Sequence, residues 1–417
     1  MYLSKFGEKF TRGSAITELM HDLGNAFHSK NPDLCMLGGG NPAFLPEAQE
    51  VFAKEMEQLI ANGLFQEMVG IYDGPEGGKS FIDVLCRYLN KQFDWAITTE
   101  NISLTNGSQN SFFYLFNLLA GEMPNGKTHK ILFPLSPEYV GYADAGLSEN
   151  MFTSRQPSIE LLDKKQFKYR INFDQLEIDN NIAAICLSRP TNPTGNVISD
   201  AELAKLDRLA KRKGIPLIID NAYGEPFPNV VYADSNTPWN ENIVLCMSLS
   251  KLGLPGARTG IVIANKKISQ AVSSLSGIIT LAPNSVGPAL MTRLIKDDEI
   301  THLTQNVIKP FYQARLATAI ELFHKILGHL PVRMHKPEGA FFLWLWIEGL
   351  PISSQELYQK LKQQHVLVIP GEHFFIGIDE AWQHTKECLR INYAQPKDRI
   401  ERGFQVLAVE LEKLNLN

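Results

Sequence analysis

Residues 182–220 read IAAICLSRPTNPTGNVISDAELAKLDRLAKRKGIPLIID. The first six residues are an apolar run of strand length, and residues 216–220 end the stretch with a second one. Between them, Ser199 and Glu202 have the spacing of a capping box that begins a helix, and basic residues followed by Gly214 end it. The stretch therefore predicts two parallel strands joined by a helix, which is the repeating unit of an α/β fold.

Further runs of strand length lie on both sides of this unit. Apolar residues fill 243–247 and 260–264, and shorter runs begin at Ile102 and Lys130. An apolar helix is expected over 110–119, directly after the small residues Gly107 and Ser108. Nearly continuous apolar runs are typical of strands that are buried on both faces of a sheet, so we expect helices on both sides.

Polar side chains stand where these strands end, which is where open α/β sheets bind ligands. Asp220 ends one strand, and Ser248, Lys251 and Arg258 follow the next. A lysine that can condense with an aldehyde, beside hydroxyl and guanidinium groups that can hold a phosphate, suits a site for pyridoxal phosphate. A carboxylate such as Asp220 can pair with the protonated pyridine nitrogen of that cofactor. Taken singly, each motif also fits an ordinary loop or a capped turn.

Two other segments fit the same ligand. The amide hydrogens at 107–109, at the start of the predicted helix, would form a cradle for an anion, although simple helix capping is the alternative. Tyr139 could lie flat on a heterocycle, and Tyr223 could turn its hydroxyl toward the same ligand.

The order of these motifs along nearly the whole chain resembles that of the fold type I pyridoxal-phosphate-dependent aminotransferases, the class I and II aminotransferase family. The motifs that carry the resemblance are Tyr72 in YDGPEGG, Gly107-Ser108-Gln109, Tyr139, Asn192 in NPTG, Asp220 with Tyr223, Ser248 with Lys251, Arg258, and Arg390 in CLRINY. The resemblance implies a large cofactor-binding domain at residues 46–300, with a mostly parallel seven-stranded sheet. It also implies a smaller α+β domain formed by residues 1–45 and 301–417.

The resemblance also implies a role for each matching residue. Lys251 would bond covalently to the cofactor and then move a proton between the substrate's α-carbon and the cofactor. Asp220 would keep the pyridine nitrogen protonated, and Arg390 would grip the substrate's α-carboxylate with its two-pronged guanidinium. Asn192 and Tyr223 would contact the phenolic oxygen of the cofactor, and Tyr139 would lie on its ring. The phosphate would be held by Gly107, Ser108, Gln109, Ser248, Ser250 and Arg258. The backbone near Gly39 and Gly40 would contact the substrate, and Tyr72 would reach the phosphate of a second subunit in a homodimer.

The prediction of the substrate rests on the lack of an identifiable positive charge for the substrate's side chain. No arginine is identifiable for a carboxylate on the substrate's side chain, which favours a small apolar amino acid because an unpaired buried carboxylate is costly. The segments 134–144 and 248–258 are most similar to family members that act on valine and pyruvate, so we expect a ping-pong exchange giving 3-methyl-2-oxobutanoate and alanine. Another aliphatic or aromatic amino donor remains an alternative, as does a pyridoxal-phosphate-dependent lyase on the same fold.

Composition limits the remaining possibilities. The 417 residues are 44% hydrophobic and carry a formal charge of −5, which argues against a nucleic-acid surface. Five scattered cysteines and the absence of an apolar signal core near the N-terminus predict a cytoplasmic protein with reduced thiols. No stretch is long and apolar enough to predict a membrane span, and the ten histidines show no metal-ligand spacing, so neither a membrane nor a metal is expected.

Overall fold

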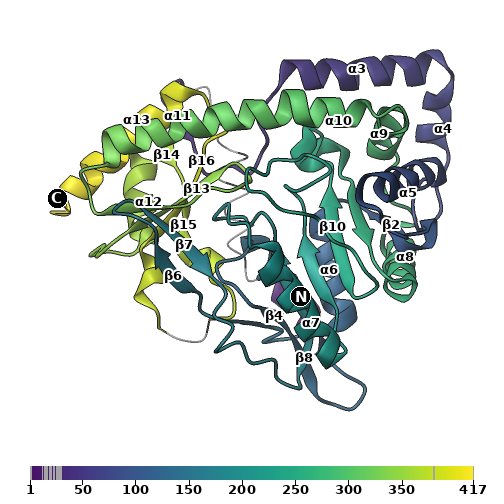
Figure 1. The fold of residues 1–417 in the computed structure, drawn as a ribbon, viewed down its shortest axis with the longest axis horizontal. Coiled ribbons are helices and arrows are strands. Elements are labelled where there is room, and N and C mark those ends of the chain that lie inside the picture. Colours follow the sequence, from purple (N-terminus) through teal and green to yellow (C-terminus); the bar gives the residue numbers. More distant parts are fainter. Residues whose placement is uncertain are drawn as a thin grey trace.

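The computed structural model describes residues 2–11, 13, 17, 21, 24, 31–378 and 381–416. Two β-sheets lie side by side, each with helices packed against it, and a long helical rod runs along both (Figure 1). The rod consists of α10 (Glu299–His302), the π-helical segment η5 (Leu303–Ile308) and α11 (Lys309–Leu327).

The first sheet contains the predicted βαβ unit. Its strand order is β2 (Ile102–Thr105), β11 (Gly260–Ile263), β10 (Ile243–Ser248), β9 (Leu217–Asp220), β8 (Ile182–Ser188), β4 (Thr128–Phe133) and β3 (Gly121–Glu122), with β5 (Phe152–Ser154) paired to β4. The run from β10 through β9, β8 and β4 to β5 is parallel, whereas β11 and β3 are antiparallel to their neighbours. The mostly parallel sheet is confirmed, and the two-residue strand β3 makes it eight-stranded instead of seven-stranded.

Alternate residues of the central strands pack against opposite layers of helices. Leu245 and Met247 of β10 belong to the apolar cluster that includes α5 (Lys79–Phe93) and α7 (Asp200–Lys213). Val244 and Cys246 face the opposite cluster, with α6 (Ser108–Leu119) and α8 (Lys266–Thr280). Burial on both faces explains why these strands are apolar at every position.

The helix α7 begins and ends as its sequence predicts. The amide of Glu202 donates to the Oγ of Ser199 at 3.2 Å, and the Glu202 carboxylate accepts from the amide of Ser199 at 2.8 Å. Gly214 ends the helix in the left-handed conformation with φ of 65°. Because glycine has no Cβ, it adopts this conformation with little strain.

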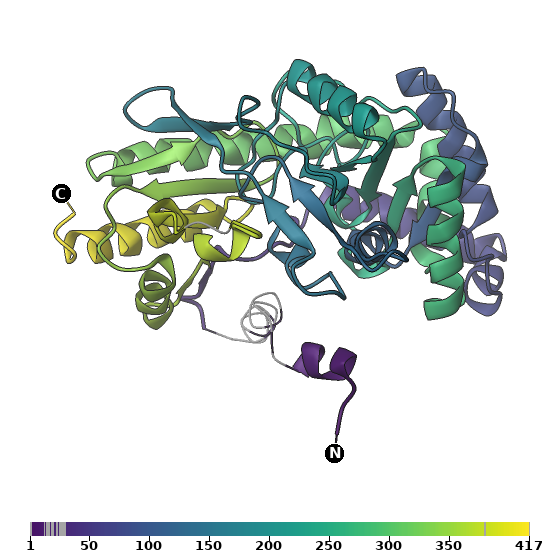
Figure 2. The same cartoon turned by 90° about the horizontal axis from the view of Figure 1, so that it is seen from below.

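The second sheet has the order β15 (Ile369–Pro370), β16 (Cys388–Asn392), β13 (Phe342–Ile347), β12 (Val332–His335), β7 (Gln166–Arg170) and β6 (Ser158–Leu161). The helices α12 (Ser354–Gln363) and α13 (Lys397–Glu412) pack at its outer end (Figure 2). The short parallel pair of β1 (Cys35–Met36) and β14 (Val366–Leu367) ties the N-terminal segment to this half.

The division into residues 46–300 and residues 1–45 with 301–417 stays a prediction, and part of its N-terminal arm lies outside the described residues. One hairpin does not follow the boundary: β6 and β7 lie within 46–300, yet β7 pairs with β12 of the second sheet.

Three further helices, α3 (Pro46–Ala61), α4 (Leu64–Gly70) and α9 (Val286–Lys296), form the end of the molecule opposite α13 (Figure 1). The remaining helices are short: α1 (Lys5–Thr11), η1 (Thr99–Asn101), η2 (Val140–Tyr142), η3 (Ser250–Leu252), η4 (Pro255–Ala257), η6 (Gly371–Phe374) and η7 (Gln383–Lys386). In the described part of the chain, no helix has the length and hydrophobicity needed to cross a bilayer.

Candidate active site

The candidate site lies at the carboxyl ends of three neighbouring strands. Ser188, the last residue of β8, is in register with Asp220, the last residue of β9. The next strand, β10, ends at Ser248, and Lys251 follows in η3. Because parallel strands end at the same edge, the fold brings these side chains together although they are far apart in the sequence.

Lys251 is a partly buried amine, and no carboxylate among the described residues forms an ion pair with it. Its Nζ donates to the carbonyl oxygen of Gly40 at 2.7 Å and lies 5.7 Å from the ring centres of Tyr223 and Phe341. The pKa of Lys251 is lowered to about 8, mainly by burial and also by the positive charges of Arg390 and Arg258, against the opposing effect of Asp220. A substantial fraction of this amine is therefore neutral and nucleophilic near pH 8.

Asp220 is held through both carboxylate oxygens. Tyr142 donates its hydroxyl to Oδ2 at 2.6 Å, and the amide of Ala222 donates to Oδ1 at 3.0 Å. Burial raises the pKa of Asp220, while the hydrogen bonds from Tyr142 and Ala222 and the charge of Lys251 oppose that rise. The sequence analysis did not predict the contact with Tyr142.

Arg390, in the centre of β16, is only 2% exposed and is fixed by neutral groups. Its Nη1 donates to Oδ1 of Asn192 and its Nη2 donates to the carbonyl oxygen of Gly38, both at 2.7 Å. Its Nε is buried without a hydrogen-bond partner, and its guanidinium lies 4.2 Å from the ring centre of Phe342. A buried cation with an unused donor is suited to a carboxylate.

Three consecutive glycine carbonyls line the opposite side. Gly38 accepts from Arg390, Gly39 accepts from Nδ2 of Asn392 at 2.6 Å, and Gly40 accepts from Lys251. Gly39 and Gly40 therefore lie beside Asn392 and Lys251, and their contact with the substrate stays a prediction; the structure adds Gly38 and Asn392 to this side. Asn392 had a signal in the sequence, because it lies two residues after Arg390 and a strand turns such residues to the same face.

Gly107 and Arg258 form a cradle at the start of α6. Gly107 is the N-cap with φ of 95°, and no side chain caps this end of the helix. A Cβ at Gly107 would lie 2.1 Å from Nη2 of Arg258 and would push this guanidinium from its place, and the φ of 95° is strained for any other residue. Nη1 of Arg258 lies 3.5 Å from Oγ of Ser250, which in turn lies 3.0 Å from Oγ of Ser248. With Ser108 as the first helical residue, these groups suit a phosphate.

The other predicted residues vary in placement. Tyr223 lies beside Lys251, and its hydroxyl is buried without a partner. Tyr139 lies against Tyr142 in an edge contact with ring centres 5.3 Å apart. The side chain of Gln109 donates to the carbonyl of Gly141 at 2.8 Å, away from the cradle that its motif predicted. Tyr72 is 80% exposed and contributes nothing to the site of its own chain.

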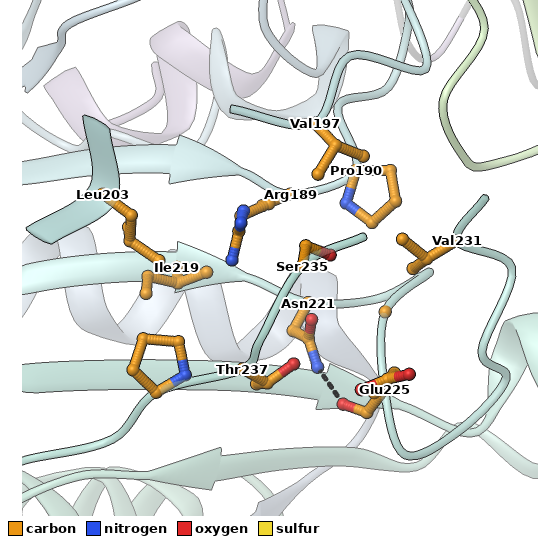
Figure 3. Close-up of a pocket in the computed structure, with 12 residues that line it drawn as sticks. Arg189, Pro190, Val197, Leu203, Ile219, Asn221, Glu225, Val231, Ser235 and Thr237 are labelled. Atoms are coloured by element: carbon orange, nitrogen blue, oxygen red, sulfur yellow. Dashed lines mark hydrogen bonds between the residues drawn. The ribbon is translucent and has the colours of Figure 1, made fainter. Parts of the chain in front are cut away.

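A separate small cavity lies behind this edge of the sheet (Figure 3). It is lined by Arg189, Pro190, Val197, Leu203, Ile219, Asn221, Gly224, Glu225, Val231, Ser235, Thr237 and Pro238. None of the predicted catalytic or binding residues lines it, so it is distinct from the site around Lys251.

Comparisons with known proteins agree with this geometry. The family model for aminotransferase class I and II matches residues 33–407. The chain is 51% identical, over 99% of both chains, to the valine–pyruvate aminotransferase of Escherichia coli (strain K12). Two similar solved structures are a putative amino-acid aminotransferase from Psychrobacter arcticum 273-4 (TM-score 0.96, 45% identity, 100% and 99% of the two chains covered) and valine-pyruvate aminotransferase from Salmonella typhimurium LT2 (TM-score 0.88, 48% identity, 96% and 99% covered).

The chain belongs to the class I and II aminotransferase family. It is an aminotransferase, and its cofactor is pyridoxal phosphate. The residues on this edge of the sheet fit that cofactor. They are a lysine amine with a lowered pKa, a buried carboxylate, a helix start without a side-chain cap beside Arg258, and the buried hydroxyl of Tyr223, which has no hydrogen-bond partner among the described residues.

Proposed function

We propose that this aminotransferase exchanges the amino group between valine and pyruvate and forms 3-methyl-2-oxobutanoate and alanine. The full-length similarity to the valine–pyruvate aminotransferase of Escherichia coli carries this proposal. The charges around the site are consistent with it, because Arg390 and Arg258 are two cations that act on Lys251. If these two hold the α-carboxylate and the phosphate, neither is left for a second carboxylate on the substrate, and an apolar side chain is favoured.

The cofactor would be held by Lys251 through its aldehyde, by Asp220 at the pyridine nitrogen, by Asn192 and Tyr223 at the phenolic oxygen, by Tyr139 at the ring, and by Gly107, Ser108, Gln109, Ser248, Ser250 and Arg258 at the phosphate. When bound, it supplies an electron sink for the bond that breaks at the substrate's α-carbon. The backbone amide of Gln109 would serve the phosphate, because its side chain is engaged with Gly141.

The protein's own groups would perform three tasks. Arg390, held in place by Asn192 and the Gly38 carbonyl, would orient the substrate through its α-carboxylate with the backbone at Gly39 and Gly40 alongside. Lys251, as a neutral amine, would take up the proton of the α-carbon and pass it to the cofactor, and its depressed pKa suits that work near neutral pH. Asp220 would remain ionised at the pyridine nitrogen and stabilise the positive charge of that nitrogen.

The experiment is a screen of amino donors against keto acids with purified holoenzyme. We expect valine with pyruvate to be the preferred pair, with 2-aminobutyrate also active because one methylene is worth only about 1 to 3 kcal/mol of discrimination. Preference for aspartate with 2-oxoglutarate would refute the substrate while leaving the family unchanged. Release of ammonia or carbon dioxide in place of transfer would favour the alternative of a lyase.

We also propose a homodimer in which Tyr72 completes the phosphate site of the partner subunit. Exposed apolar side chains support it, because they gather on α3, α4 and α8 and the segments that follow: Ile60, Leu64, Val69, Ile71, Tyr72, Ile278, Ile279 and Leu281. Exposed apolar surface of this extent marks an interaction site. Sedimentation at assay concentration tests the assembly, and a fully active monomer would contradict it.

A cytoplasmic location is proposed as well. The cysteines support it, since all five are free and buried, as expected in a reducing compartment. Fractionation of cells that express the native chain is the direct measurement.

A further inference from the structure

A second carboxyl group lies buried behind Asp220. Glu138, between β4 and η2, is 2% exposed. Its Oε1 accepts from the amide of Ser188 at 2.9 Å, and its Oε2 lies 2.5 Å from Oγ of Ser188. The same Oγ lies 3.4 Å from the hydroxyl of Tyr142, which donates to Asp220 at 2.6 Å. Four buried groups therefore form one line from Glu138 to Asp220.

The number of hydrogens available to these four groups depends on whether Glu138 is ionised or neutral. If Glu138 is ionised, Ser188 must donate to Glu138 while Tyr142 donates to Asp220, and no hydrogen remains between Ser188 and Tyr142. If Glu138 is the neutral acid, its Oε2 donates to Ser188, Ser188 donates to Tyr142, and Tyr142 donates to Asp220. Each contact is then a hydrogen bond, and all of them point toward the Asp220 carboxylate.

The surroundings of Glu138 favour the neutral acid. Among the residues that the structure describes, the carboxyl of Glu138 is hydrogen-bonded by Ser188, and no cation forms an ion pair with it. The titratable groups that face it are Asp220, Tyr142 and Cys186, none of which is positive. The pKa of Glu138 is raised to about 8, mainly by burial and also by the charge of Asp220, although hydrogen bonds from Ser188 and from the backbone of Tyr139 oppose the rise. The neutral acid is therefore the major form at pH 7.

We propose that Glu138 is a positioning residue that acts as a neutral acid and, through Ser188 and Tyr142, holds Asp220 as the carboxylate beneath the cofactor. This inference rests on the proposed role of Asp220. A chain of hydrogen bonds that all point the same way is mutually strengthening, and it ends on a charged acceptor, where such bonds are strongest. Glu138 thereby lowers the proton affinity of Asp220 without adding a second negative charge to the pocket.

The first test needs no cofactor. Infrared difference spectra of the apoprotein, between the native chain and Glu138→Gln at pH 7, should contain the C=O stretching band of one buried neutral carboxylic acid that the variant lacks. Absence of that band, with the carboxylate bands of Glu138 in its place, would overturn the proposal. This result concerns the protonation of Glu138 alone, so it stands whether or not Asp220 serves the cofactor.

The second test uses two variants that differ in their donors. Glu138→Leu removes the donor at the head of the chain and should lower kcat/KM about tenfold or more, and shift the acid limb of its pH profile upward as Asp220 becomes easier to protonate. Glu138→Gln is uncharged but keeps an N–H donor toward Ser188. It should therefore retain most of the native kcat/KM, and the acid limb of its pH profile should lie close to that of the native enzyme. Tyr142→Phe should behave as Glu138→Leu does.

The matched control is Glu410→Leu, which removes another buried carboxyl, on α13 far from the site, and should leave the acid limb in place. If Glu138→Gln lost as much as Glu138→Leu, the charge of Glu138 would be the active feature and the proposal would fail. If instead Asp220→Asn had no effect while the infrared band was present, the proposed function of Asp220 would fail and the neutral Glu138 would stand.

Discussion

Replacing Arg390 with lysine would test the substrate site most directly. The guanidinium has three nitrogens: Nη1 is engaged by Asn192, Nη2 by the Gly38 carbonyl, and Nε is buried and unused. A lysine ammonium keeps the charge but has a single nitrogen, so it cannot serve both neighbours and also offer a fork to a carboxylate. Loss of one charge-assisted hydrogen bond to the substrate costs about 1.5 to 3 kcal/mol.

That loss corresponds to a decrease in kcat/KM of roughly 10- to 150-fold. Because the α-carboxylate is common to all amino acids, the decrease should be similar for valine, alanine and 2-aminobutyrate in steady-state assays. Arg402→Lys is the control, since Arg402 forms an exposed ion pair with Asp33 and should change nothing. A decrease of less than threefold, or a loss confined to one donor, would refute the assignment of Arg390 to the α-carboxylate.

Three other substitutions and one pH profile test the remaining groups. Lys251→Ala should abolish turnover. It should also abolish the covalent attachment of the cofactor, which borohydride reduction makes permanent and mass spectrometry detects, because the variant lacks the amine that bonds to the cofactor. In the native apoprotein, the rate of cofactor uptake should rise with pH around a midpoint of about 8, since only the neutral amine attacks and burial lowers its pKa to that value. Asp220→Asn should lower kcat at least tenfold, or about 1.4 kcal/mol, in steady-state assays. Gly107→Ala should weaken cofactor binding in equilibrium dialysis, because its Cβ would lie 2.1 Å from Nη2 of Arg258 and its φ of 95° is strained.

Each of these results has an outcome that would count against it. Normal turnover in Lys251→Ala would remove the lysine from the mechanism. A midpoint near 10.5 for cofactor uptake would mean that the amine is solvated. A change of less than tenfold in Asp220→Asn would place its carboxylate away from the pyridine nitrogen. Unaltered cofactor affinity in Gly107→Ala would show that the cradle can relax.

Much of the site could be predicted because its residues lie at the ends of strands. The runs that end at Leu187 and Ile219 are apolar at every position, which indicates buried parallel strands, and such strands bring their ends to one edge. Lys251 and Arg258 belong to that edge for the same reason, since they follow the next strand of the sheet. The contribution of Gln109 was only partly predictable: its motif begins a helix as expected, but packing turns its side chain to Gly141.

The amino-acid sequence by itself determined the strands, the capped helix α7 and the motifs at the strand ends, because periodicity, capping and turn preferences depend on residues that are close together in the sequence. The tertiary structure alone decided that the hairpin 158–170 joins the second sheet and that Glu138, Ser188, Tyr142 and Asp220 meet in one buried line. The same is true of the bond between Arg390 and Gly38, which lie 352 positions apart in the sequence. Such contacts are selected by burial and hydrogen-bond satisfaction in the folded chain, and no local pattern in the sequence carries that information.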